Sequence, residues 1–220
     1  MNRPAPALLQ PRKAPRQARS AATIDAIHTA TIQVLLAEGV GRLTTTRVAE
    51  RAGVSIGSMY QYYPHKQALL FAIVERQLQS IMSAMLVAAQ HLEGRDVATV
   101  AEGLAIAWLD AKTADRVASR AIYGIAAEFD LGEVMGEAKR QMTQVIGQLL
   151  AAAPDARFAD LASAAFMLTA LLGGSVRMVM ETEDSEDSLA CLRQELPRAC
   201  KAYLAAANWG AAQGAPCLRD

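Results

Sequence analysis

The sequence is poor in aromatic residues and in residues that interrupt helices. Only 5% of its 220 residues are aromatic, whereas 52% are hydrophobic. Such a composition predicts an interior built from aliphatic side chains and alanine. Its 14 glycines and 8 prolines are sparse after residue 16, which favours a mostly helical, all-α protein.

Cysteine and long apolar runs are also scarce. The three cysteines, Cys191, Cys200 and Cys217, form no disulfide framework, and their odd number is typical of reduced thiols in the cytoplasm. Residues 1–20 contain no apolar core of a secretory signal. The apolar, uncharged run 161–176 is shorter than the roughly 20 residues of a membrane span. We therefore expect a cytoplasmic protein without a membrane partner.

Signatures of catalysis and of metal binding are missing as well. The sequence has no glycine-rich phosphate loop, no nucleophile elbow and no His/Glu metal motif. The short "GVG" at 39–41 follows a helical pattern, whereas a dinucleotide-binding turn follows a strand. His28, His65 and His91 do not have metal-ligand spacing with the cysteines. An enzyme is therefore not predicted, and neither a cofactor nor a metal is expected.

The charges are distributed unevenly, although Lys plus Arg and Asp plus Glu both number 22. Residues 1–66 contain nine basic and three acidic residues, a net charge of +6. The remaining residues contain 13 basic and 19 acidic residues, a net charge of −6. This asymmetry indicates an N-terminal module that binds a polyanion, followed by a domain with a different task.

Within the basic module, three helices are predicted. Apolar residues recur every three or four positions from Ser20, and Gly39 and Gly41 follow them. The segment "TTTRVAERAG" predicts a short helix that a threonine caps and Gly53 ends. A second short helix follows Ser55 and reaches about Tyr62. Two short helices joined by a glycine-containing turn are typical of a helix-turn-helix unit.

Further helices are predicted to the end of the chain. Pro64 separates the module from a long helix over 66–91. Periodicity then predicts helices over 96–112, 114–128, 132–151, 156–181 and 186–207.

Residues 43–70, "LTTTRVAERAGVSIGSMYQYYPHKQALL", closely resemble the DNA-binding signature of TetR-type bacterial transcriptional repressors. This resemblance implies an N-terminal three-helix DNA-binding domain and a larger helical domain for ligand binding and dimerisation. It also implies a homodimer that binds double-stranded operator DNA and that a small molecule releases. We accordingly expect a disordered basic arm over 1–19, a DNA-binding domain over 20–66, an effector-binding and dimerisation domain over 67–210, and a tail over 211–220.

The predicted DNA-binding residues lie in and beside the two short helices. The small first turn of the second helix allows close approach to the major groove, while the threonines and Arg47 offer hydrogen bonds to phosphate or bases. The resemblance implies DNA contacts for Tyr60, Tyr62 and Lys66, and a buried position for Tyr63. The complete predicted set is Thr44, Thr45, Thr46, Arg47, Ser55, Ile56, Gly57, Ser58, Tyr60, Gln61, Tyr62 and Lys66. Since this set offers few groups for base readout, specificity should also depend on backbone approach and DNA shape.

The basic residues of the arm, Arg12, Lys13, Arg16 and Arg19, either reach a minor groove or remain solvated.

For the C-terminal domain, periodicity suggests an interface and a pocket. The predicted dimer interface comprises Leu168, Leu172, Gly173, Ser175, Val179, Leu192, Leu196 and Tyr203, with burial inside one subunit as the alternative. Bulky residues that would line a pocket for a hydrophobic effector, or else form ordinary core, are Trp108, Tyr123, Phe129, Met135, Met142, Phe166 and Met167.

The sequence therefore predicts a ligand-responsive regulator that binds a palindromic operator as a dimer, most simply a repressor. Two alternatives remain on the same fold. One is a sequence-tolerant architectural DNA-binding protein, in which the acidic domain serves only assembly. The other is a transcriptional activator.

Overall fold

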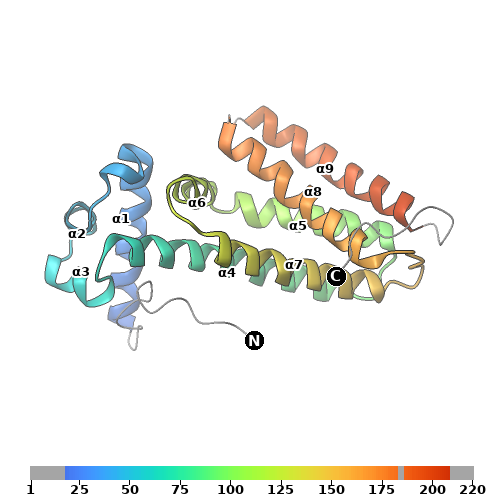
Figure 1. Ribbon diagram of the computed structural model, residues 1–220, viewed down its shortest axis with the longest axis horizontal. Helices are drawn as coiled ribbons and strands as arrows, with labels where there is room; N and C mark the ends of the chain where they lie inside the picture. Colours follow the sequence, from blue (N-terminus) through green and yellow to red (C-terminus); the bar gives the residue numbers. More distant parts are fainter. Residues whose placement is uncertain (1–17, 183–185, 209–220) are drawn as a thin grey trace. The chain divides into compact units, whose positions relative to one another are not determined.

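The computed structural model describes residues 18–182 and 186–208, which contain nine α-helices and no strand (Figure 1). The all-α prediction is confirmed. The helices are α1 (Ala18–Arg42), α2 (Thr45–Ala52), α3 (Ile56–Tyr62), α4 (Lys66–Leu92), α5 (Val97–Thr113), α6 (Arg116–Glu128), α7 (Gly132–Ala151), α8 (Leu161–Thr182) and α9 (Glu186–Ala207).

These helices form two compact units. Among the described residues, the first unit comprises 18–78 and 117–130, and the second comprises 79–116, 131–182 and 186–208. The division falls within α4, later than the boundary at residue 66 that the sequence suggests. The first unit also includes α6, which lies outside the predicted DNA-binding domain. Of the predicted arm over 1–19 only the last two residues are described, and the predicted tail over 211–220 lies outside the described residues.

Local sequence signals determine where the short helices of the first unit begin and end. The Oγ1 atom of Thr44 caps α2 by accepting a hydrogen bond from the Arg47 backbone N–H at 3.2 Å. Gly53 ends α2 in the left-handed conformation, with φ of 66°. The Oγ atom of Ser55 then caps α3 through the Ser58 N–H at 3.0 Å. Gly39, with φ of 78°, interrupts α1 where the sequence predicts its end.

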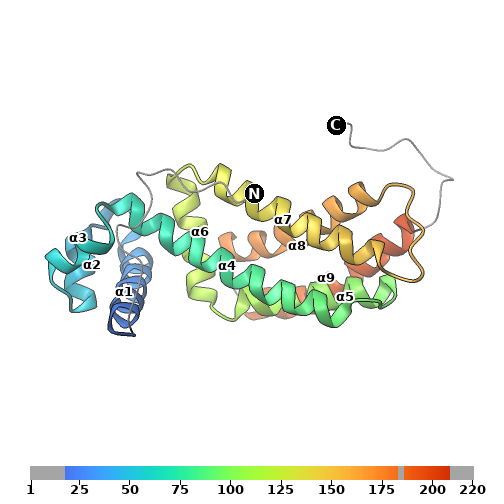
Figure 2. The same ribbon diagram turned by 90° about the horizontal axis from the view of Figure 1, so that it is seen from below.

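The second unit is a helical bundle whose core is aliphatic. α5 packs against α9, α7 against α8, and α8 against α9 (Figure 2). Its largest fully buried side chains are Met85, Leu104, Leu109, Ile146 and Leu150. Two surface ion pairs also connect α9 to α5, one between Lys201 and Glu102 at 2.9 Å and one between Arg193 and Asp110 at 2.7 Å.

Two helices are long and apolar enough to cross a membrane by length and composition. They are α4 and the 161–180 part of α8, with mean hydropathies of 1.2 and 1.4. A core helix of a soluble protein can meet the same criteria, so this observation is weak evidence of a membrane span.

Replacing Gly53 by alanine should destabilise the first unit. No atom lies within 4 Å of the Cβ that the substitution adds, so the cost is purely conformational. A left-handed alanine costs about 1 kcal/mol, which urea denaturation would measure. Gly124→Ala is the matched control, because Gly124 lies in helix α6 of the same unit and also has open space. An equal effect of both substitutions would contradict this account.

Candidate functional site

α2 and α3 carry exposed side chains in the region that the sequence predicts to bind DNA. Ile56 and Tyr60 lie one turn apart on α3 and are 41% and 43% exposed. Met59 is fully buried on the opposite side of the helix, together with Val48 and Ala49 from α2. The predicted residues Thr44, Thr46, Arg47, Ser55, Gly57 and Gln61 are also exposed, and Ser58 is half-buried. α3 is therefore anchored by one apolar side and free on the other.

The first turn of α3 is small and its backbone is accessible. Ser55 and Ser58 direct their hydroxyl groups at each other, with 2.9 Å between the two Oγ atoms. A Cβ added at Gly57 would meet only the Ser55 Oγ, at 3.9 Å. Another molecule can therefore approach the helix backbone here more closely than along a turn that carries larger side chains.

Thr45 supports Tyr60 from within the domain. Its side chain is buried, and its Oγ1 donates a weak hydrogen bond to the Tyr60 hydroxyl oxygen at 3.4 Å. The structure thus gives Thr45 a different role from its neighbours Thr44 and Thr46, which the sequence pattern does not distinguish from it.

Tyr62 and Tyr63 both belong to the interior. Tyr63 is buried as predicted, whereas Tyr62, predicted to contact DNA, is only 7% exposed. Their ring centroids lie 6.5 Å apart. The buried hydroxyl of Tyr63 has a partner, because it lies 2.7 Å from Nε2 of His28 on α1. The Tyr63 backbone N–H also bonds to the Met59 carbonyl and closes α3.

The hydrogen bonds of His28 assign its tautomer. An Arg76 guanidinium nitrogen lies 3.3 Å from Nδ1 of His28, and because arginine only donates, Nδ1 must accept. Nε2 then carries the proton and donates to the Tyr63 hydroxyl oxygen. The same Arg76 nitrogen pairs with Asp25 at 2.5 Å. The cluster of His28, Tyr63, Arg76 and Asp25 therefore connects α1, the end of α3 and α4.

The environment of this cluster keeps both rings neutral. Burial, with a smaller contribution from the Arg76 charge, lowers the pKa of His28 from 6.5 to about 4, although Asp25 opposes the shift. Burial likewise raises the pKa of Tyr63 to about 12. A protonated imidazole would turn Nδ1 into a donor facing Arg76, so the network requires the neutral form.

Lys66, the last predicted DNA contact, is directed toward its own chain. Its Nζ donates to the Val40 carbonyl at 2.7 Å and lies 5.8 Å from the centroid of the Phe129 ring. Val40 is near the C-terminal end of α1, where carbonyls lack partners in the helix and attract a cation. In this structure the lysine supports the end of α1.

Two arginines of α2 also form polar contacts with side chains of α1. Arg47 forms an ion pair with Glu38, and Arg51 donates to the Gln33 side-chain oxygen at 2.8 Å. Both guanidinium groups remain exposed, and an exposed ion pair contributes only about 0–1 kcal/mol. Arg47 can therefore exchange Glu38 for another anion at little cost.

The residues predicted to line a ligand pocket are divided between the two units. Tyr123 and Phe129 lie in the first unit, and the other five lie in the second. Met142 is buried, Trp108 and Met135 are half-buried, and Phe166 and Met167 are exposed on α8. The pocket assignment of the seven residues stays a prediction.

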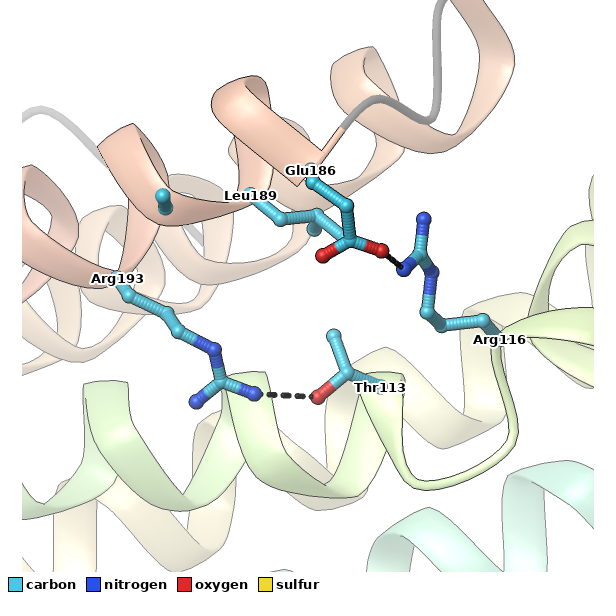
Figure 3. A pocket seen from close by; sticks show the side chains of 6 residues that line it. Thr113, Arg116, Glu186, Leu189 and Arg193 are labelled. Atoms are coloured by element: carbon cyan, nitrogen blue, oxygen red, sulfur yellow. Dashed lines mark hydrogen bonds and ion pairs between the residues drawn. The ribbon is translucent and has the colours of Figure 1, made fainter.

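A polar hollow in the second unit was not predicted from the sequence. Its volume is about 250 Å³, and its lining is Thr113, Arg116, Glu186, Leu189, Ala190 and Arg193 (Figure 3). Arg116 pairs with Glu186, 70 residues along the chain, while Arg193 donates to Thr113 at 2.8 Å. Such distant pairs leave no periodic signal in the sequence.

Among the described residues, no group of three or more His, Cys, Asp or Glu side chains could hold a metal ion.

The predicted dimer interface needs correction. Leu168, Leu172, Val179 and Leu196 are buried in the core of a single chain, so the alternative of burial within one subunit applies to them. Gly173, Ser175, Leu192 and Tyr203 are half-buried. The apolar pattern identifies a side of α8 that must be covered, and the subunit's own core covers it. The exposed face of α8 instead presents Phe166, Met167, Ala170, Gly174 and Met178.

Acid should weaken the fold through His28. Since folding lowers the pKa of His28, its stabilising contribution is complete above pH 6.5 and is lost as the pH falls toward 4. The loss amounts to about 3 kcal/mol. Urea denaturation across this range should show a correspondingly weaker pH dependence for His28→Gln than for the wild type. His91→Gln, which removes an exposed histidine, should retain the wild-type dependence. Identical profiles for all three proteins would contradict the assignment.

Comparison with known proteins places this geometry in a family. Residues 27–73 match the family described as bacterial regulatory proteins, tetR family, and residues 96–204 match the tetracyclin repressor-like C-terminal domain. Together these matches cover more than half of the chain. The nucleoid occlusion factor SlmA of Haemophilus ducreyi is 41% identical over 46 residues, but the match spans only 21% of this chain and 23% of that protein.

Solved structures share the fold over nearly the whole chain. A tetR-family regulatory protein from Rhodococcus RHA1 is 23% identical, with a TM-score of 0.62 over 87% of this chain and 98% of its own. The SmeT–triclosan complex is 24% identical, with a TM-score of 0.64 over 84% and 91% of the two chains. The two family matches, the helix-turn-helix unit and the helical second unit lead to one conclusion: this chain belongs to the TetR family of transcriptional regulators, which are not enzymes.

Proposed function

We propose that the protein is a cytoplasmic, ligand-responsive transcriptional repressor that binds a palindromic operator as a homodimer. The observation that carries the proposal is the exposed face of α3, whose small first turn stands clear of larger side chains. Because the major groove of DNA admits an α-helix, this turn can approach the bases closely.

The exposed side chains fall into two groups, those that would contact base edges and those that would contact phosphate oxygens. Ile56 offers apolar contact to a thymine methyl group, and the exposed Gln61 offers a bidentate amide to adenine. Thr44, Thr46, Arg47 and the Tyr60 hydroxyl lie beside them for phosphate oxygens. Ser55 and Ser58 lie at the N-terminal end of α3, next to these residues. This arrangement has few base readers, so DNA shape and half-site spacing must contribute to specificity.

Three residues of the predicted DNA set act instead as supports. Thr45 positions Tyr60, Tyr62 packs in the interior, and Lys66 stabilises the end of α1. Substitution of these residues would alter DNA affinity through the position of α3, with little change in the salt dependence that reports phosphate contacts.

A gel-shift assay on the DNA that flanks the protein's own gene tests the function. Specific binding to a palindromic site, abolished by a small molecule, supports the proposal. The known complex of SmeT with triclosan supports an apolar compound as one probe. If no such site is bound, or if no compound in a chemically broad panel releases it, the ligand-responsive repressor is excluded.

Gly57→Ala should weaken operator binding by about 10-fold or more, because the added methyl group separates the helix backbone from the DNA. Folding should be preserved, since the new Cβ meets only Ser55 Oγ at 3.9 Å and alanine favours a helix. Gly124→Ala serves as the control outside this face. Unchanged affinity of Gly57→Ala, measured by fluorescence anisotropy, would show that the backbone does not approach DNA here.

The exposed apolar face of α8 supports dimerisation. Met167, Ala170, Gly174 and Met178 follow one another at spacings of three or four residues, and Phe166 lies beside them. Large exposed apolar patches mark interaction sites, and the small residues in the middle permit close helix approach. The same face on a second copy, related by a two-fold axis, would cover it.

Met178→Glu should convert the dimer into a monomer at micromolar concentration. This methionine is 63% exposed in a single chain, so the substitution costs little before association but buries a charge in the interface. Val87→Glu, at an exposed apolar position of α4, is the matched control and should remain dimeric. Sedimentation equilibrium separates the two outcomes, and a monomeric wild type would exclude the interface altogether.

A sequence-tolerant DNA-binding role is the second candidate. It is favoured by the scarcity of side chains on α3 that could read bases. A genome-wide binding profile distinguishes the candidates, because a repressor gives few sharp sites and an architectural protein gives broad occupancy.

A further inference from the structure

A second hollow lies in the first unit, between α1 and α2. Its volume is about 400 Å³. Its charged lining residues are two arginines and two glutamates, so their formal charges cancel. The lining comprises Val34, Ala37 and Glu38 from α1 and Arg47, Glu50 and Arg51 from α2. The hollow therefore brings carboxylates of the chain close to arginines that α2 carries beside the proposed DNA contacts.

Arg47 is held at this hollow by α1. Its Nη1 atom donates to Oε2 of Glu38 and, at 3.4 Å, to the Arg42 carbonyl oxygen. The side chains of Arg47 and Glu38 are 48% and 35% exposed, so water reaches both. The pair can therefore open without leaving a buried charge, and its net contribution to stability is small.

Arg51 has a neutral partner in the same region. Its Nε atom donates to the Gln33 side-chain oxygen at 2.8 Å. An amide oxygen and a carboxylate oxygen thus each hold one arginine of α2 against α1, and the two contacts differ in charge. Since glutamine is sufficient to hold an arginine here, positioning alone does not require the negative charge of Glu38.

A DNA phosphate would compete with the Glu38 carboxylate for Arg47. Both groups are oxyanions, and arginine binds carboxylate and phosphate with the same fork of N–H donors. If Arg47 leaves Glu38 for a phosphate, the ion pair is lost. If Arg47 keeps Glu38, the carboxylate stays close to the phosphate and repels it. In either case Glu38 opposes the binding of DNA at this arginine.

We propose that Glu38 is an internal competitor of DNA phosphate, and that its contact with Arg47 limits the affinity of the protein for DNA. This inference rests on the proposed function. It assigns a role in DNA binding to Glu38, which the sequence did not single out. A regulator that an effector releases needs a limited affinity, because an effector shifts the equilibrium only by the difference between its affinities for the two states.

Glu38→Gln tests the competition, because it removes the charge and keeps an oxygen that accepts from Arg47. Fluorescence anisotropy would measure binding to two duplexes, the DNA that flanks the protein's own gene and a random sequence of equal length. Binding should tighten by about 5-fold per subunit, the equilibrium ratio of a favourable exposed ion pair. The slope of log K against log[salt] should steepen by about 0.9 per subunit, because the carboxylate that Arg47 leaves in the wild type takes up a cation. Unchanged affinity and slope would overturn the proposal.

Two further variants separate the ion pair from a general effect of charge. Glu102→Gln removes the glutamate of an exposed ion pair in the second unit, and should bind DNA as the wild type does. In an Arg47→Met background, Glu38→Gln should lose most of its effect, because the competition needs the guanidinium group. An equal gain with and without Arg47, or the same gain from Glu102→Gln, would show general repulsion only and overturn the proposal. Thermal unfolding checks that each variant retains the fold.

The random duplex separates this inference from the function on which it rests. If the wild type binds both duplexes equally, the operator-specific repressor is excluded, while tighter binding by Glu38→Gln would still support the competitor. If the flanking DNA is bound specifically and Glu38→Gln changes nothing, the repressor is supported and the competitor is overturned. Binding of neither duplex would exclude both.

Discussion

The neutral imidazole of His28 is the interaction on which the geometry of α3 depends. One ring nitrogen donates to Tyr63 at the end of α3, and the other accepts from Arg76 on α4. A single buried side chain thus determines where a seven-residue helix ends relative to α1. A helix this short has too few internal hydrogen bonds to be stable alone, so its position must come from such tertiary contacts.

This anchoring explains why the exposed face of α3 can be so small. With Met59, Tyr62 and Tyr63 turned inward, the helix needs no large outward side chain for its stability. Ser55, Gly57 and Ser58 then leave the backbone accessible for the proposed approach to DNA. Thr45 and Lys66 act in the same way from either side, by holding Tyr60 and the end of α1. The buried residues fix the position of α3, and the small exposed residues leave its outer face accessible.

The helices could be predicted from the sequence because their signals are local. Thr44, Ser55 and Gly53 act within a few residues, and apolar periodicity needs only one helix. The partners of polar groups were harder to predict, since His28 and Tyr63 are 35 residues apart. Apolar periodicity also identifies a helix face that must be buried, but it does not show whether the same subunit or a partner covers that face. For this reason the pattern leaves open whether a partner or the subunit's own core covers Leu168 and Leu172, and the structure shows that the core does.

The two units differ in how fully their buried polar groups are hydrogen-bonded. In the first unit, both nitrogens of His28 have partners, so the cost of burying the ring is offset within the chain and the result is a fixed geometry. In the second unit, the buried indole N–H of Trp108 has no acceptor among the described residues. A fully satisfied network specifies one arrangement, whereas an incomplete one is stabilised by whatever completes it.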